Sequence, residues 1–322
     1  MLILNEGDIR TAVSLEEIMD EVENALRLGE TGDYVMPLRT YLEYEGNSFL
    51  LMPCFTPPAF GAKLVTVFPR NPEKGRPVIE SLMVLNNAAT GETLALLNGK
   101  ALTALRTGAV GGVAVRRLSP DQPHALGLIG AGVQGFQQAR FAAATGKIDR
   151  ILVHDRLADK VPDFVQALAQ AVPDVPVARA ESAEALLESC RTVIAATTSN
   201  EPVLPDRPEL LAGRHFVGIG SYRPTMREFP EALFHLVERV WVDTVYALEE
   251  SGDLTDPLQK GWLKRDQVET LGRFLLEPGD RRPRPGQTTL FKSVGMALFD
   301  VLVSWLIYRK ALEKGLGREV AL

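Results

Sequence analysis

The spacing of hydrophobic positions changes several times along the 322 residues, and each change predicts a different element. Near the N-terminus, Ser14-x-x-Glu17 precedes apolar residues at helical spacing, which predicts a capped amphipathic helix. From residue 39 to about residue 97, short β-like runs are separated by glycine, proline and asparagine, so we expect an antiparallel β region. Residues 100–118 then predict a helix rich in small side chains.

Beyond residue 119, apolar runs of strand length alternate with segments of helical pattern. The strand-like runs are residues 125–130, 150–155, 176–180, 192–199, 215–221 and 240–243. Such alternation predicts parallel strands joined by right-handed crossovers, which is the doubly wound, Rossmann type of sheet.

The final apolar segment, residues 293–312, is hydrophobic around much of its helical circumference. We expect this helix to be buried, either on the first domain or on a second subunit. The expected fold class is therefore α/β, with a doubly wound parallel (Rossmann) sheet that begins near residue 119 and follows a separate β region.

A glycine-rich turn follows the first of the predicted parallel strands. In Gly130-x-Gly132-x-x-Gly135, the first glycine permits the tight turn, the second the approach of a pyrophosphate, and the third close helix packing. The next strand ends at Asp155, where a carboxylate can accept ribose hydroxyls; a glycine loop without a ligand is the alternative. Asp155 favours NAD(H), whereas the adjacent Arg156 could approach a 2′-phosphate, so NADP(H) stays open.

The composition and charge argue against several classes of protein. A net charge of −6 argues against a nucleic-acid partner, which would require a basic face. No apolar run is long enough to cross a bilayer, and the N-terminal segment lacks the pattern of a signal peptide, so we expect no membrane association. Cys54 and Cys190 are too few for a disulfide framework, which favours the cytoplasm. The four histidines lack metal-ligand spacing, and we expect no metal.

Three cations lie in unusual surroundings. Arg106 interrupts a helix of small and apolar residues, Lys63 lies in a strand-like run, and Arg39 begins the β region. Taken singly, they have simpler interpretations: a structural ion pair, an outward-facing lysine and a surface arginine. Together they could bind the carboxylate of an α-imino, α-keto or α-amino acid, with lysine protonating the atom next to the carbon that accepts hydride.

A series of short motifs also lies in order along the chain. They are Met36-Pro37-x-Arg39, Met52-Pro53, Gly61-x-Lys63, Ala104-Leu105-Arg106-Thr107, Gly130-Ala131-Gly132-Val133-Gln134, Thr197-Thr198-Ser199, Gly218-x-Gly220-Ser221, Glu250-x-Gly252-Asp253-Leu254 and Lys292-Ser293-Val294-Gly295-x-Ala297. In this combination the chain resembles the ornithine cyclodeaminase, μ-crystallin and archaeal-type alanine dehydrogenase superfamily, over essentially its whole length.

The resemblance implies a homodimer and a two-domain organisation. Residues 119–292 would form an NAD(P)-binding Rossmann domain, inserted in an α+β substrate-binding and dimerisation domain of residues 1–118 and 293–322. The resemblance also implies a set of site residues. Arg39, Lys63 and Arg106 would bind the carboxylate of a small imino or amino acid, and Lys63 would be the catalytic residue near the reacting carbon. The residues implied in cofactor binding are Thr107, Gly130, Gly132, Val133, Gln134, Asp155, Arg156, Thr197 and Ser293.

Two departures from the family pattern bear on the substrate. Ornithine-cyclising members carry an acid in the loop after the fifth strand and another before the Met-Pro pair, where this chain has Tyr222 and Leu50. A side-chain ammonium would lose two acceptors, so its desolvation would be poorly compensated. The loop at residues 220–229 instead resembles that of μ-crystallin and the bacterial cyclic-ketimine reductases.

The resemblance therefore predicts an NAD(P)H-dependent reductase of cyclic ketimine carboxylates, acting on C=N bonds. Its substrates would be 1-pyrroline-2-carboxylate or 1-piperideine-2-carboxylate, giving proline or pipecolate. Ornithine cyclodeaminase is the first alternative, followed by an alanine or opine-type dehydrogenase. A nucleotide-dependent ligand-binding protein with little turnover is an alternative of another class.

Overall fold

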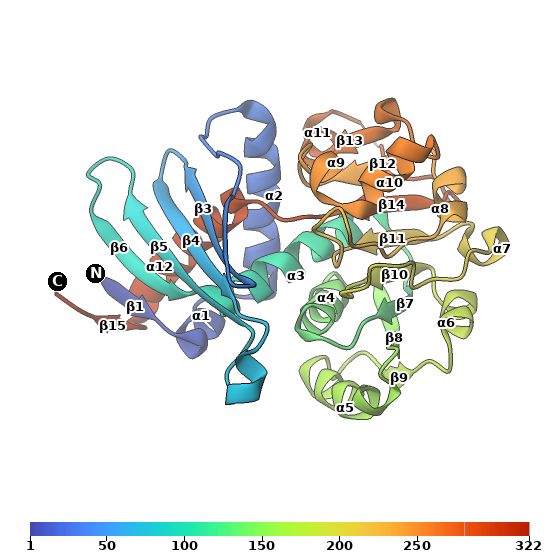
Figure 1. The fold of residues 1–322 in the computed structure, drawn as a ribbon, viewed down its shortest axis with the longest axis horizontal. Helices are drawn as coiled ribbons and strands as arrows, with labels where there is room; N and C mark the ends of the chain where they lie inside the picture. The colour runs from blue at the N-terminus through green and yellow to red at the C-terminus, as the bar shows by residue number, and fades with distance from the viewer. Residues whose placement is uncertain (280, 322) are drawn as a thin grey trace. The chain divides into compact units, whose positions relative to one another are not determined.

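The computed structural model describes residues 1–279 and 281–321, which form two compact units (Figure 1). Unit 1 consists of Met1–Arg106 and Met296–Leu322, and unit 2 of Thr107–Gly295. Unit 2 is thus inserted in the sequence of unit 1. Together with the parallel sheet described below, this arrangement confirms the predicted α/β class.

Within the described residues, unit 1 contains a seven-stranded sheet in the order β15-β1-β6-β5-β4-β3-β2. Its strands are β1 (Leu2–Leu4), β2 (Thr40–Tyr44), β3 (Asn47–Phe55), β4 (Ala59–Val67), β5 (Ile79–Asn87), β6 (Thr93–Asn98) and β15 (Arg318–Glu319). From β2 to β6 each strand pairs antiparallel with the next, as the alternating β-like runs predict. A short 3₁₀ turn, η1 (Asn71–Lys74), separates β4 from β5.

Three helices accompany this sheet: α1 (Glu6–Ala12), α2 (Leu15–Thr31) and α12 (Ala297–Lys314). The predicted cap of α2 is present, because Glu17 N donates to Ser14 Oγ and Ser14 N donates to a carboxylate oxygen of Glu17. The apolar C-terminal helix α12 packs on α2, β3 and β4. Its hydrophobic surface is therefore covered largely within its own chain, and Leu302 and Leu306 are buried there.

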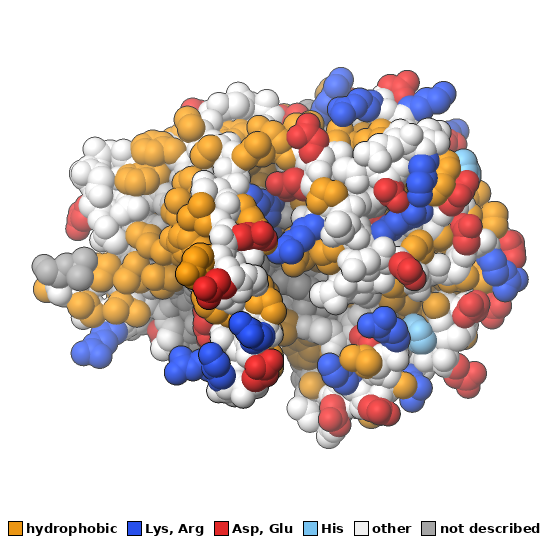
Figure 2. Space-filling model, viewed as in Figure 1, with side chains coloured by type: hydrophobic (Ala, Val, Ile, Leu, Met, Phe, Trp, Pro, Cys, Tyr) orange, Lys and Arg blue, Asp and Glu red, His pale blue; other side chains and the backbone are white. Residues whose placement is uncertain are grey.

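The other face of the sheet carries an apolar surface, which we call the outer face: Leu42, Phe49, Phe55, Leu64 and Leu82. Cross-strand pairing places Leu42 beside Phe49 and Leu64 beside Leu82, on the side opposite the residues that contact α12. Leu42 is 57% exposed and Phe49 is 37% exposed. Figure 2 shows hydrophobic side chains gathered over the strands of unit 1. An apolar surface of this kind is typical of a protein interface.

Unit 2 contains, within the described residues, an eight-stranded sheet in the order β13-β12-β14-β11-β10-β7-β8-β9, with parallel pairing. Its strands are β7 (His124–Ile129), β8 (Ile148–His154), β9 (Val177–Arg179), β10 (Thr192–Ala195), β11 (His215–Gly218), β12 (Val240–Val242), β13 (Val268–Thr270) and β14 (Thr289–Lys292). The chain runs outward from β7 to β9 and then returns to β10 on the other side of β7. This reversal confirms the doubly wound sheet and makes the β7/β10 edge its switch point.

The connecting segments of unit 2 are mostly helical. They are α4 (Val133–Ala144), η2 (Ala158–Lys160), α5 (Val161–Ala171), α6 (Ala183–Ser189), α7 (Pro208–Leu211), α8 (Glu231–Leu236), α9 (Ala247–Glu250), α10 (Gly252–Lys260), η3 (Arg265–Gln267) and α11 (Leu271–Leu276). None of the helices in the described residues has the length and apolar character needed to cross a bilayer.

Helix α3 (Gly99–Leu118) continues from unit 1 into unit 2, so the first boundary falls at residue 106 and not at the expected residue 118. The residues of α3 after Arg106 group with unit 2 because their small side chains pack closely on α4. A Cβ atom at Gly108 would lie 2.5 Å from the Phe141 ring, and one at Gly111 would lie 1.7 Å from Gln138 Oε1. Only glycine allows this close approach.

The second boundary falls after residue 295 and not at the expected residue 292. Asp243, which directly follows β12, holds the segment after β14. Its Oδ2 atom accepts from Ser293 Oγ at 2.6 Å and from the backbone N of Gly295 at 2.7 Å. These hydrogen bonds keep residues 293–295 with the parallel sheet.

Candidate active site

Unit 1 contains a buried cluster of charged residues from three elements. Lys63 of β4 donates from Nζ to Oδ1 and Oδ2 of Asp300 in α12, at 2.9 and 2.8 Å. Arg106 of α3 donates from Nε to Oδ1 of the same carboxylate at 3.0 Å. The Lys63 side chain is 2% exposed and that of Asp300 is 0% exposed. The cluster therefore lies within the packed interior of unit 1.

Strand alternation explains why Lys63 points inward. Ala59, Gly61 and Lys63 occupy successive buried positions of β4, on the face that α12 covers. The alternative of an outward-facing lysine is thus wrong. For Arg106, the simpler interpretation was a structural ion pair, and Asp300 is the partner in such a pair.

Asp300 was missed in the sequence, although it carries a recognisable signal. Asp300 is the one charged residue between residues 294 and 308, and Arg106 is the one charged residue between residues 101 and 115. A buried charge requires a partner, so isolated charges of opposite sign on buried helices are candidates for pairing. The sequence separation of 194 residues left no local cue that these two would meet.

The cluster carries more positive than negative charge. The pKa of Lys63 is lowered to about 8, mainly by burial; Asp300 opposes the shift, and repulsion from Arg106 and Arg39 contributes to it. The half-buried Arg39 therefore acts on the same ammonium, as the grouping of the three cations predicts. Lys63 and Arg106 carry two positive charges against the one carboxylate of Asp300, which leaves positive charge for an additional anion.

Arg106 is arranged to bind such an anion. Within the described residues its hydrogen bonds involve Nε alone, so Nη1 and Nη2 keep their donors. Parallel N–H donors of a guanidinium fit a carboxylate in a bidentate manner. The ion pair with Asp300 thus orients the arginine without using its fork.

Leu50 and Tyr222, the two departures from the ornithine-cyclising pattern, lie in different units and are described separately. Leu50 lies on the same sheet face as Met52, whose cross-strand neighbour is Lys63. Its hydrocarbon side chain offers no acceptor for an ammonium. In unit 2, Tyr222 is 43% exposed, and its ring lies 5.6 Å from the Arg223 guanidinium carbon.

The predicted dinucleotide turn of unit 2 has the geometry its glycines imply. Gly130 has a φ of +109°, and a Cβ atom there would lie 2.6 Å from Ala196 O. At Gly135 a Cβ atom would lie 2.0 Å from Gly130 O, so helix and turn pack closely. At Gly132, by contrast, a Cβ atom would meet no atom within 4 Å apart from those of the adjoining residues. The turn therefore has open space at the glycine assigned to pyrophosphate approach.

Helix α4 begins at this turn and has free donors. Gly132 is its N-cap and supplies no side-chain hydrogen bond, so the first N–H groups remain available to a phosphate. Val133 is exposed at the helix start, and Gln134 Oε1 is buried without a hydrogen-bond partner in the described residues. The open space at Gly132, the uncapped amides of α4 and the unsatisfied Gln134 oxygen are the features expected of a site that binds a dinucleotide.

Asp155 lies where the sequence places it, directly after β8. Its Oδ2 accepts from Ala131 N and its Oδ1 from Leu157 N, both at 2.7 Å. The carboxylate thereby holds the glycine turn, and each oxygen retains a lone pair for a ribose hydroxyl. The next residue, Arg156, is exposed.

The remaining residues implied in cofactor binding have partners inside unit 2. Thr197 Oγ1 donates to Glu228 Oε1 at 2.9 Å, and Ser293 Oγ donates to Asp243 Oδ2 at 2.6 Å. Thr107 accepts at its backbone oxygen from Gln138 Nε2 at 2.8 Å. The hydroxyl protons of Thr197 and Ser293 are thus already used, which leaves their other atoms for cofactor contact.

Among the described residues, no group of three or more His, Cys, Asp or Glu is placed to hold a metal ion.

Known proteins share the whole architecture. Residues 1–315 match the model of the ornithine cyclodeaminase/mu-crystallin family. The Delta(1)-pyrroline-2-carboxylate reductase of Bacillus cereus is 32% identical over 326 aligned residues, covering 99% of both chains. The structure of the Thermococcus litoralis Delta(1)-pyrroline-2-carboxylate reductase with NADH and L-proline gives a TM-score of 0.91 at 31% identity, covering 99% of this chain and 100% of that one. An archaeal alanine dehydrogenase dimer with bound NAD gives 0.90 at 29% identity, covering 100% and 99%. This chain belongs to the ornithine cyclodeaminase/mu-crystallin family.

Proposed function

We propose that this protein is an NAD(P)H-dependent reductase of cyclic ketimine carboxylates, which converts 1-pyrroline-2-carboxylate to proline or 1-piperideine-2-carboxylate to pipecolate. Its similarity over 99% of the chain to proteins named Delta(1)-pyrroline-2-carboxylate reductase supports the activity. The observation that carries the proposal is the buried cluster of Lys63, Arg106 and Asp300, because it combines an anion-binding fork with a proton donor.

The residues of the cluster divide the work of binding and proton transfer. Arg106, with Nη1 and Nη2 available, would hold the substrate carboxylate, and Arg39 would add positive charge. Lys63, with its pKa lowered to about 8, would donate a proton to the ring nitrogen. Asp300 would orient the ammonium through its two hydrogen bonds.

The cofactor would be held by unit 2. The α4 amides and the open side of Gly132 would hold the pyrophosphate, and Asp155 the adenosine ribose. NAD(P)H, when bound, supplies hydride to the carbon of the C=N bond. Asp155 favours NADH, and use of NADPH would depend on Arg156.

The preference for a cyclic imine over ornithine rests on Leu50 and Tyr222. Neither side chain supplies the carboxylate that would compensate the desolvation of a side-chain ammonium. A planar cyclic imino acid has no such group, and the carboxylate fork, the proton donor and the hydride donor suffice for its reduction.

The active form would be a homodimer in which a second copy covers the outer face of unit 1. The archaeal alanine dehydrogenase described above is a dimer, and the exposed apolar residues of the outer face provide a matching surface here. We expect the enzyme to act in the cytoplasm, since Cys54 and Cys190 are both unpaired and buried.

The decisive experiment mixes the purified protein with NADH or NADPH and pyrroline-2-carboxylate. We expect loss of the reduced nicotinamide absorbance with formation of proline, and little ammonia release from ornithine in parallel reactions. Equal or greater catalytic efficiency with ornithine would restore the cyclodeaminase interpretation. Tight NADH binding with no turnover of either substrate would indicate a ligand-binding protein.

A further inference from the structure

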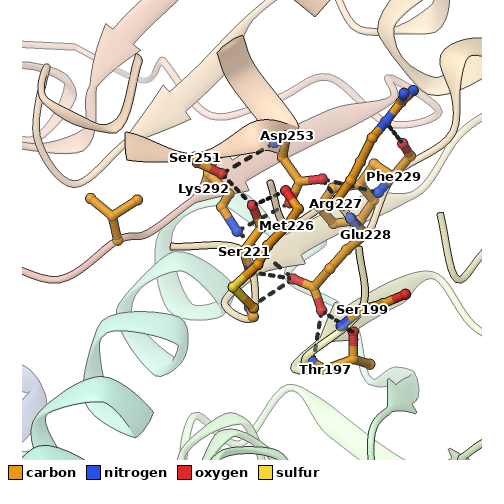
Figure 3. A network of polar contacts seen from close by, with 12 residues as sticks. Thr197, Ser199, Ser221, Met226, Arg227, Glu228, Phe229, Ser251, Asp253 and Lys292 are labelled. Carbon is orange, nitrogen blue, oxygen red and sulfur yellow. Dashed lines mark hydrogen bonds and ion pairs between the residues drawn. The ribbon is translucent and has the colours of Figure 1, made fainter. Parts of the chain in front are cut away.

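A buried network of charged residues lies in unit 2, apart from the cluster of unit 1 (Figure 3). It consists of Glu228 before α8, Asp253 in the first turn of α10 and Lys292 at the end of β14, and none of the three side chains is exposed. Burying three charges is costly unless each is paired and hydrogen-bonded. Their arrangement therefore calls for a role that an apolar core could not fill.

Glu228 joins two loops through separate oxygens. Its Oε1 accepts from the backbone N of Thr197 at 2.7 Å and from Thr197 Oγ1 at 2.9 Å. Its Oε2 accepts from Gly220 N at 2.7 Å and from Ser221 N at 3.2 Å. Thr197 follows β10, and Gly220 and Ser221 follow β11. One carboxylate thus fixes the loops at the carboxyl ends of two neighbouring strands.

These loops lie beside the dinucleotide turn. A Cβ atom on Gly130 would lie 3.2 Å from Thr197 Cγ2, and one on Gly220 would lie 2.0 Å from Thr197 O. The contacts place the Thr197 loop against the turn at the β7/β10 switch point, where doubly wound sheets bind their ligands. The position of Thr197 consequently shapes the edge of this site.

Glu228 is itself held in place by the other two charged residues. Asp253 Oδ1 accepts from Glu228 N at 2.7 Å and from Phe229 N at 3.1 Å. Lys292 Nζ lies 3.1 Å from Asp253 Oδ2 and 3.8 Å from Glu228 Oε2. Burial raises the pKa of Glu228, and the Lys292 ammonium opposes that shift. Lys292 thereby compensates the negative charge of both acids.

We propose that Glu228 is a positioning residue of the dinucleotide site, whose carboxylate holds the Thr197 and Gly220 loops in the arrangement that receives the cofactor. Asp253 and Lys292 support it by fixing its backbone and compensating its charge. The inference rests on the proposed function in so far as that function assigns a dinucleotide to unit 2.

The chemistry of the carboxylate suggests a selective test. A glutamine at this position has nearly the same size, but only one of its terminal atoms accepts hydrogen bonds. Its NH₂ group would face either the two donors of Thr197 or the two backbone donors of residues 220 and 221. Glu228→Gln therefore keeps the shape of the side chain and releases one loop.

The experiment compares Glu228→Gln with wild type and with Glu269→Gln. Glu269 is a matched control, because it is a buried acid of the same unit on β13 and it pairs with Arg239 at 2.9 Å and Arg281 at 3.0 Å. NADH affinity is measured by fluorescence, and loop order by hydrogen exchange of residues 196–200 and 219–227. We expect Glu228→Gln to raise the Kd for NADH about tenfold and to speed exchange in at least one loop. Glu269→Gln should leave both measurements near wild type.

Wild-type NADH affinity in a folded Glu228→Gln protein would overturn the inference, as would equal effects of the two variants. Should Glu228→Gln fail to fold, wild-type exchange provides the test. We expect the amides of Thr197, Gly220 and Ser221 to be protected equally with and without NADH, and protection that appears only with NADH would refute preorganisation by Glu228. A wild-type protein that binds NADH but reduces no cyclic imine would instead overturn the proposed substrate class.

Discussion

The ammonium of Lys63 donates to both carboxylate oxygens of Asp300, at 2.9 and 2.8 Å, across a sequence separation of 237 residues. Both side chains are buried, so each compensates a charge that would otherwise be buried without a partner. The pair also determines the chemistry of the lysine, because burial lowers its pKa to about 8 and Asp300 limits the shift. Asp300 thus keeps a deeply buried lysine able to hold a proton.

Asp300→Asn should move the pH dependence of imine reduction. Removing the negative charge lowers the pKa of Lys63 below about 8, since the effects of burial, Arg106 and Arg39 are then unopposed. Proton donation needs protonated lysine, so activity falls as pH rises through that pKa, and the fall should begin at lower pH in the variant. The pH profile of kcat measures the change. As a control, Asp121→Asn removes an acid that pairs with Lys147 at 2.9 Å, and it should leave the profile unaltered.

Arg106→Ala should weaken the interaction with substrate by about 2–5 kcal/mol, because the buried carboxylate of the substrate loses its charged partner. Arg106→Lys should restore only part of this energy, since an ammonium lacks the bidentate fork. Both variants should bind NADH normally in a fluorescence titration, whereas kcat/KM for the imine should fall. Unchanged imine kinetics would mean that Arg106 serves only as the ion-pair partner of Asp300.

Asp155→Ser should shift cofactor preference toward NADPH, because the carboxylate repels a 2′-phosphate and Arg156 can then approach it. The structure adds a second effect. Asp155 accepts from Ala131 N and Leu157 N, so serine should also loosen the glycine turn and weaken NADH binding. The ratio of kcat/KM for the two cofactors tests the shift. Asp155→Ser combined with Arg156→Ala should lose any gained NADPH preference, and an unaltered ratio in the single variant would show that the ribose lies elsewhere.

Paired substitutions on the outer face should convert a dimer to a monomer. Leu42 and Phe49 are cross-strand neighbours, and replacing both with lysine would place two charges in an interface that excludes water. Light scattering at micromolar concentration should give a dimer for wild type and a monomer for this variant. Leu312→Lys alters an exposed residue of α12, away from the outer face, and should remain dimeric. A monomeric wild-type protein would contradict the prediction.

Stability should decrease as pH falls below neutrality, in part through His215. Burial lowers the pKa of His215 to about 3, and repulsion from His124 and Lys147 adds to the shift. In the unfolded chain this histidine takes up a proton near pH 6.5, whereas in the folded protein it stays neutral until about pH 3. Protonation therefore favours unfolding progressively from pH 6.5 downward.

His215→Gln removes this titration and keeps a polar side chain for the partner hydroxyl of Thr289. Between pH 7 and pH 5 the wild type should lose roughly 1–2 kcal/mol more stability than the variant. Urea unfolding at the two pH values measures the difference. Equal losses in both proteins would show that His215 is not protonated more readily in the unfolded state.

Local patterns determined much of the fold and part of the candidate site. The capping box of Ser14 and Glu17 and the turn at Gly130 involve residues a few positions apart, so their geometry follows from spacing and glycine conformation. Asp155 could be placed because parallel strands bring the ends of β7 and β8 to one edge of the sheet. The apolar pattern of residues 293–312 likewise predicted a buried helix, which the structure places at residues 297–314.

The tertiary structure decided which distant groups meet. Hydrophobicity shows that α12 must be covered, but any apolar surface satisfies that requirement, and only the fold places it on α2 and the sheet. Asp300 and Glu228 act through partners brought together by chain topology, which leaves no periodic trace in the sequence. A buried charge indicates that a partner exists, whereas the identity of that partner depends on the three-dimensional packing of segments far apart in the chain.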